Sequence, residues 1–315
     1  MNERPSRNIS GRPLFIEGEN LAFGGQDNRG RFCLLFVVAF LLIGSVIGLS
    51  EPISFSPVQV ALVSDHRTIE PGKPFLVAIH QDIQPGYHTY WKNAGTVGLA
   101  SSIKWILPDG FTAGPLQWPI PEISQMADYR VWAYRDEALL VTEITPPADL
   151  PLNHEYTLSG EASWMCCGKQ CYPGFDTMSV TVTSGKTARQ ALDWQPRFRR
   201  VLNEQPRPAE SWSLKAERRG EHYQLTVTPL DPSQVSNIRN VFFFGYERQV
   251  SSDKAQKVTL TPTSLVITME HEEFSGEDRD RLTGMLASST PWQAAFPQSP
   301  LLVDVPLVIK DDSNE

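Results

Sequence analysis

Apolar and polar residues alternate along most of the chain beyond residue 50, which is the pattern of strands with one buried face. The alternation occurs at 58–62, 75–79, 103–105, 139–144, 156–164 and 178–182. Turn signals such as Pro85-Gly86 and Pro108-Asp109-Gly110 separate these stretches. Short alternating strands divided by turns at this spacing predict an all-β protein built of β-sandwiches.

The alternation stops between residues 187 and 203, where arginine and alanine are frequent. This stretch predicts a short helical linker that is interrupted at Pro196, since proline disrupts a helix interior. Strand patterns return at 225–230, 241–246, 258–268 and 301–309. We therefore expect a first β domain at 52–185, a linker at 186–207 and a second β domain at 208–312.

Residues 33–50 form an uncharged apolar run that follows Arg29 and Arg31. As a helix the run would be about 27 Å long, just short of a hydrocarbon core, while the apolar region of a secretory signal is usually shorter. Gly48-Leu49-Ser50 offers a small-x-small cleavage site. A signal peptide and a single membrane anchor both remain open, after a disordered extension at 1–32. Either one places the rest of the chain in the periplasm or another extracytoplasmic compartment, where disulfides persist.

The composition fits a packed globular protein, with 41% hydrophobic and 20% charged residues. The formal net charge is −8 and no basic block stands out. This balance argues against nucleic acid as a partner.

Three of the four cysteines crowd into residues 164–174. Cys167 and Cys171 are separated by three residues that include Gly168, a spacing that suits a tight hairpin loop. Residues that face each other across an antiparallel pair have Cα atoms about 4.5–5.5 Å apart, within the range of a disulfide. Because so short a loop gains only about 2 kcal/mol from a bridge, a disulfide that opens and closes is more plausible than a structural staple.

Cys166 shares its strand face with Trp164, whereas Cys167 points to the other face. Cys166 is therefore either a buried apolar residue or a third participant. Lys169 in the loop would favour a thiolate, or it is an ordinary solvated lysine. A static disulfide and a copper(I) site also remain open, although no C-x2-C pair supports a zinc site.

Other catalytic motifs are missing from the sequence. It contains no G-x-S-x-G, H-E-x-x-H, phosphate-binding glycine loop or dinucleotide fingerprint. The segments 85–91 and 129–134 are rich in aromatic residues, which predicts either core packing or a shield over a reactive disulfide.

Four stretches, at 88–95, 110–119, 134–137 and 164–174, carry a family resemblance. They resemble the exported N-terminal domain of the DsbD and ScsB thiol:disulfide interchange proteins. The ScsB-like members are most similar, because their C-x3-C pair is followed by an apolar residue, proline and glycine. Cys167, Cys171, Pro173 and Gly174 fit that pattern, and 282–285 with 303–307 resemble the second ScsB β domain.

The resemblance implies two immunoglobulin-like β-sandwich domains and the activity of a protein-disulfide oxidoreductase. Such a module receives electrons from a thioredoxin-like or membrane-embedded thiol reductase. It passes them to exported disulfide reductases or isomerases, without a cofactor or a metal. The chain ends at Glu315 without a membrane relay, so we expect the reductant to act in trans.

The family also implies roles for single residues. Cys171 would form the mixed disulfide and Cys167 would resolve it, under a shielding loop near 125–132. His88 and Tyr90 fall where aromatic neighbours of the pair occur, and Tyr134 is a further auxiliary candidate.

Two rival functions remain at this stage. The chain could be a binding or adaptor module that keeps the fold without the redox relay. It could also handle copper through Cys166, Cys167 and Cys171.

Overall fold

The computed structural model describes residues 56–273, 275 and 279–310. The predicted extension at 1–32 and the signal or anchor at 33–50 lie outside these residues. Within the described part, no helix is long and apolar enough to cross a membrane. Residues 55–315 form one compact unit.

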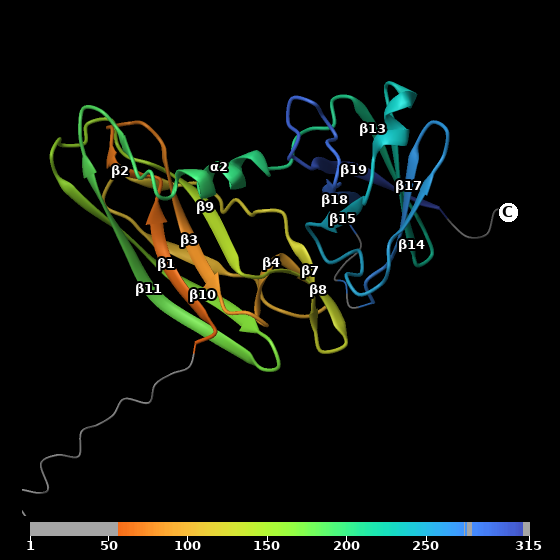
Figure 1. Ribbon diagram of the computed structural model, residues 1–315, viewed down its shortest axis with the longest axis horizontal. Helices are drawn as coiled ribbons and strands as arrows, with labels where there is room; N and C mark the ends of the chain where they lie inside the picture. Colours follow the sequence, from red (N-terminus) through yellow and green to blue (C-terminus); the bar gives the residue numbers. More distant parts are fainter. Residues whose placement is uncertain (1–55, 274, 276–278, 311–315) are drawn as a thin grey trace, which may run out of the picture. The chain divides into compact units, whose positions relative to one another are not determined.

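The first half of this unit is a sandwich of two sheets (Figure 1). Its strands are β1 (Val58–Ser64), β2 (His66–Ile69), β3 (Phe75–Ile83), β4 (His88–Gly95), β5 (Ser102–Ile106), β6 (Thr112–Ala113), β7 (Glu122–Met126), β8 (Tyr129–Tyr134), β9 (Glu137–Thr145), β10 (Glu155–Cys167), β11 (Cys171–Ser184) and β12 (Arg189–Gln190). One sheet has the order β1-β3-β9-β6, and the other the order β12-β2-β11-β10-β4-β8-β7, with β5 beside β10. The alternating apolar residues meet between the two sheets, as strands with one buried face require.

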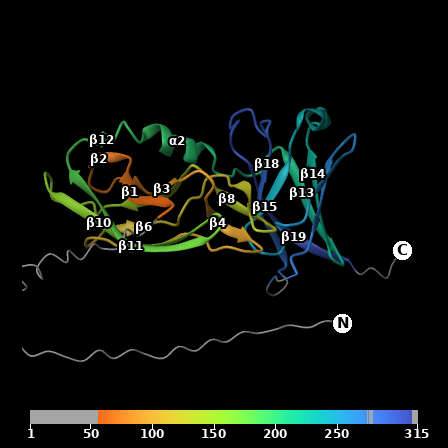
Figure 2. The same cartoon turned by 60° about the horizontal axis from the view of Figure 1, so that its bottom comes forward.

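Helix α2 (Gln195–Asn203) follows the first sandwich and covers the outer face of its smaller sheet (Figure 2). Phe198 and Val201 pack there against Leu139 and Val141. The predicted interruption at Pro196 is wrong, because this proline lies in the first turn of the helix. A proline is tolerated there, since the N–H that it lacks would have no helical partner.

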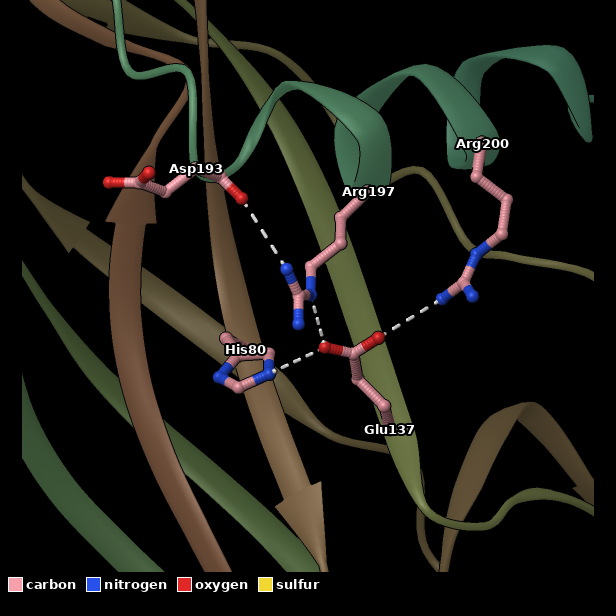
Figure 3. A network of polar contacts seen from close by, with 5 residues as sticks. All are labelled: His80, Glu137, Asp193, Arg197 and Arg200. Atoms are coloured by element: carbon pink, nitrogen blue, oxygen red, sulfur yellow. Dashed lines mark hydrogen bonds and ion pairs between the residues drawn. The ribbon is translucent and has the colours of Figure 1, made fainter.

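A polar network fastens α2 to the sheet beneath it (Figure 3). The Glu137 carboxylate on β9 accepts hydrogen bonds from Arg197 and, at 3.4 Å, from Arg200 of the helix. It also contacts Nε2 of His80 on β3 at 3.1 Å. The carboxylate thus ties one helix to two strands.

The second half is a curled seven-stranded sheet with the order β15-β18-β19-β13-β14-β17-β16. Its elements are β13 (Trp212–Arg219), β14 (His222–Pro229), the 3-10 helix η1 (Pro232–Asn237), β15 (Phe242–Gly245), β16 (Lys257–Leu260), β17 (Leu265–Glu270), β18 (Arg281–Ala287) and β19 (Leu301–Lys310). Every strand of this sheet except the end strand β16 contributes residues to one core. The predicted all-β fold of immunoglobulin-like type is confirmed. The domain boundaries at 52–185, 186–207 and 208–312 stay a prediction.

One predicted strand, at 258–268, is instead a hairpin of β16 and β17. The chain turns at Thr261, whose backbone N–H donates to the Ser264 carbonyl at 2.8 Å. Pro262 suits the second position of such a turn, because its fixed φ matches the turn geometry.

Contacts join the two halves near β4 and β8. Phe244 of β15 packs against Trp91 and Trp132, with ring centroids 6.0 and 5.6 Å away. Asn93 of β4 donates hydrogen bonds from Nδ2 to the carbonyls of Gly245 and Glu247 at 2.9 and 3.0 Å. The strand that carries His88 and Tyr90 is therefore supported from the second half.

Candidate redox site

The cysteine pair closes the tip of the long β10–β11 hairpin. Cys167 and Cys171 face each other at the last paired position of the two strands, and a disulfide joins them with Cα atoms 4.1 Å apart. The Gly168 N–H donates to the Gln170 carbonyl at 3.0 Å across the turn. The hairpin and the bridge are as the spacing of the cysteines predicts.

The turn has no room for a side chain at position 168, so it requires Gly168. A Cβ atom there would lie 2.8 Å from the Gly86 carbonyl oxygen and 2.9 Å from the Tyr87 ring. The turn between β3 and β4 therefore packs directly against the redox hairpin.

The two sulfurs of the bridge differ in exposure. Cys167 is 1% exposed and packs with Tyr90, Val131 and Ala133, whereas Cys171 is exposed. Cys171 is therefore the more accessible of the two cysteines to a thiolate from outside.

Cys166 lies on the opposite face, as strand parity predicts. Its side chain is fully buried in the main core of the first sandwich. Burial raises the pKa of the Cys166 thiol to about 12, so it remains protonated at neutral pH. In the described part of the chain, no three His, Cys, Asp or Glu side chains lie together as metal ligands would.

A second hairpin, of β7 and β8, lies over the bridge. Its Met126 sulfur is 3.9 Å from the Cys171 sulfur. The chain turns at Ala127, which has a φ of +51°. This hairpin occupies the segment near 125–132 for which a shielding loop is expected, and it partly covers the reactive sulfur.

His88 begins β4 directly opposite Cys167. It is 3% exposed, and its ring packs edge-on against Tyr90 with centroids 5.0 Å apart. Burial, assisted by the charge of Arg135, lowers the pKa of His88 to about 4, so the imidazole is neutral at neutral pH. Burial, with a smaller effect of Cys166, raises the pKa of Tyr90 to about 12.

A groove of about 430 Å³ opens beside His88. Ser124 and Gln125 of β7 line it, together with Arg130 and Arg135. Arg135 donates two hydrogen bonds of 2.7 Å to the Glu122 carboxylate. The groove thus carries both charged and polar side chains, and it is lined by His88, the residue that pairs with Cys167 across the strands.

The other two auxiliary candidates are placed differently. Tyr134 points into the main core and donates a hydrogen bond to the Pro119 carbonyl at 2.8 Å. Lys169 is exposed at the hairpin tip. The structure therefore groups His88 and Tyr90 with the bridge, and Tyr134 with the sandwich core.

The sequence did not indicate Met126, Ser124 or Arg135 as site residues. They come from a hairpin without glycine or proline at its turn, so no turn signal marks it. The aromatic residues of β8 and the family resemblance, through the shielding loop expected near 125–132 and the stretch at 134–137, pointed to this region without assigning these residues a role.

Residues 59–183 match the family described as the N-terminal part of the thiol:disulfide interchange protein DsbD. The fold resembles the N-terminal periplasmic domain of ScsB from Proteus mirabilis, with a TM-score of 0.56 and 14% identity over 81% of this chain and 94% of that one. The periplasmic chaperone SfaE covers 80% of this chain and 100% of its own length at 11% identity, but its TM-score is only 0.22. No curated protein sequence matches the chain.

Proposed function

Residues 59–183 belong to the DsbD N-terminal family, and from this premise we propose that the chain is an exported dithiol carrier that exchanges electrons with protein partners. The observation that carries the proposal is the disulfide at the hairpin tip, with one exposed and one buried sulfur. A bridge of this kind directs attack to a single sulfur and keeps the leaving group within the protein.

Reduction proceeds in two exchange steps. A thiolate of the partner attacks the Cys171 sulfur, the S–S bond breaks, and the electron pair goes to Cys167, which then takes up a proton. A second partner thiolate attacks the partner's own sulfur in the mixed disulfide and releases Cys171. The partner is oxidised to a disulfide, and the pair gains two electrons and two protons.

Onward transfer is the same chemistry in reverse. The Cys171 thiolate attacks a client disulfide, and Cys167 resolves the mixed disulfide by attacking Cys171. No cofactor takes part, because the cysteines carry both electrons.

We assign two kinds of partner to this carrier. The reductant is a thioredoxin-like or membrane-embedded thiol reductase, and the clients are exported disulfide reductases or isomerases. The match to a DsbD-type domain and the likeness of the fold to a periplasmic domain support a periplasmic location.

Trapping of the mixed disulfide tests the assignment. With an oxidised thioredoxin-like protein, the Cys171 thiolate of Cys167→Ser should attack the partner's disulfide and accumulate a mixed disulfide, because Cys167 is not there to resolve it. Cys171→Ser should not, because its remaining Cys167 is buried. Cys166→Ala is the matched control and should exchange like the wild type. If the wild type exchanges no faster than the Cys167→Ser/Cys171→Ser variant, the chain is not a carrier.

A further inference from the structure

Breaking the disulfide places a negative charge on a sulfur that solvent does not reach. Cys167 is 1% exposed, and its neighbours Tyr90, Val131 and Ala133 offer an apolar surface. A thiolate in such surroundings is poorly stabilised, so the leaving group needs a proton or a hydrogen-bond donor.

His88 is in a position to meet this need. It stands opposite Cys167 in the β4–β10 ladder, and paired positions in an antiparallel ladder place their side chains on the same face. The His88 Nε2 atom is buried and has no hydrogen-bond partner within the described part of the chain. An unsatisfied buried nitrogen is costly, and a group beside a reacting sulfur can retain one for chemistry.

The other ring nitrogen faces the solvent side. Nδ1 of His88 lies 3.4 Å from the Ser124 hydroxyl, and both residues line the groove of about 430 Å³. His88 therefore lines the groove on one side and pairs with Cys167 in the ladder on the other.

We propose that His88 relays a proton between this groove and the Cys167 sulfur during disulfide exchange. As the S–S bond breaks, the Cys167 sulfur takes the proton from Nε2, and Nδ1 takes a proton from water in the groove. The ring remains neutral and changes tautomer, and the Cys167 sulfur ends as a protonated thiol. The reverse transfer deprotonates Cys167 when it resolves a mixed disulfide. The inference rests on the proposed function only for the identity of the attacking thiol.

The charges around His88 suit a neutral relay. Arg130 and Arg135 reach the groove from β8 and its end, and Glu122 of β7 pairs with Arg135. Tyr87 precedes His88 in the chain, and Tyr90 of the same strand packs against the His88 ring. Burial and, to a smaller extent, the charge of Arg135 disfavour a charged imidazolium, which keeps both nitrogens available for transfer.

The test measures reduction of the disulfide by dithiothreitol, which needs no protein partner. His88→Phe keeps an aromatic ring without nitrogen, and His88→Gln keeps a hydrogen-bond donor that cannot relay a proton. Both should be reduced roughly 100-fold more slowly than wild type at pH 7, which is the low end for general acid–base catalysis. Added imidazole should restore several-fold of the lost rate, since the groove admits a small proton carrier. His154→Gln, at an exposed histidine, is the matched control and should react like the wild type.

If His88→Phe and His88→Gln are both reduced at the wild-type rate, the proposed proton relay is wrong. It is also wrong if imidazole does not change the loss of rate, because His88 would then act only through packing. Far-UV circular dichroism establishes that each variant is folded, and the Gln variant carries the test if the Phe variant is not. The His88 variants could slow reduction by dithiothreitol while the wild type fails to exchange with a thioredoxin-like protein. In that case the proton relay would stand and the proposed function would fail.

Discussion

Cys166 and Cys167 are adjacent in the chain, yet the strand separates their chemistry. Cys166 packs with the core of the first sandwich, while Cys167 lies on the opposite face with Tyr90. A thiol whose pKa is raised to about 12 by burial is a weak nucleophile at neutral pH. Of the three cysteines in the described residues, Cys167 and Cys171 are therefore the two that we propose for exchange.

We predict that Cys166 is inert in the native protein. After reduction of the bridge, iodoacetamide should modify Cys171 and leave Cys166 unmodified until the protein is denatured. Cys166→Ala should retain exchange and lose about 1–2 kcal/mol of stability, as expected when a small buried group is removed. Peptide mass spectrometry of the alkylated protein checks this, and native labelling of Cys166 would make it a third participant.

His88 should make the protein acid-sensitive. Its pKa falls from 6.5 to about 4 in the folded protein because of burial, so the unfolded chain binds a proton between these pH values and the native protein does not. The free energy of unfolding should therefore be highest above pH 6.5 and decrease as the pH falls towards 4, by up to about 3 kcal/mol. Urea unfolding at pH 4–7 should show a smaller decrease in His88→Gln; equal slopes in the two proteins would remove His88 as the cause.

At the scale of elements, the two hairpins of the site differ in how far the sequence predicts them. The β10–β11 hairpin follows from alternation on both sides of a three-residue loop with a glycine. The β7–β8 hairpin has no such signal. Its turn residue Ala127 adopts a φ of +51°, which few residues other than glycine favour, so contacts made elsewhere must maintain the turn.

Those contacts come from residues more than a hundred positions away. The Ser252 hydroxyl donates to the Arg130 carbonyl at 2.8 Å, and the Asp253 carboxylate accepts from the Arg130 N–H at 3.0 Å. A local pattern holds no information on such partners. The aromatic run at 85–91 predicted either core packing or a shield, and its residues 88–91 are buried within β4.

We predict that Ser252→Ala loosens the β7–β8 hairpin. Ser252 is 2% exposed, and it also accepts a hydrogen bond from the Thr96 N–H at 3.0 Å, so its loss leaves buried backbone groups unpaired. Amide hydrogen exchange in 122–134 should become faster, and dithiothreitol should reduce the bridge several-fold faster as Met126 moves off Cys171. Ser233→Ala, at an exposed serine, is the control. If amide hydrogen exchange in 122–134 is unchanged, Ser252 does not hold the hairpin.

At the scale of the whole compact unit, the sandwich that carries the disulfide depends on the second sheet. Phe244 and Met285 belong to the same core cluster as Trp91 and Trp132, although they lie on β15 and β18. The sequence predicted two β domains, but it could not show that one contributes side chains to the core of the other. The second β region therefore supplies part of the core of the first sandwich.

Phe244→Ala should therefore destabilise the first sandwich as well as the second sheet. The ring is 4% exposed and contacts both Trp91 and Trp132, so truncation removes buried contacts on each side and should cost about 3–5 kcal/mol. Urea unfolding, followed by tryptophan fluorescence and by alkylation of Cys166, should shift to lower midpoints with both probes. Phe175→Ala, where the ring is 79% exposed, should change the midpoint little. A shift seen by fluorescence without earlier alkylation of Cys166 would mean that the first sandwich unfolds independently of its neighbour.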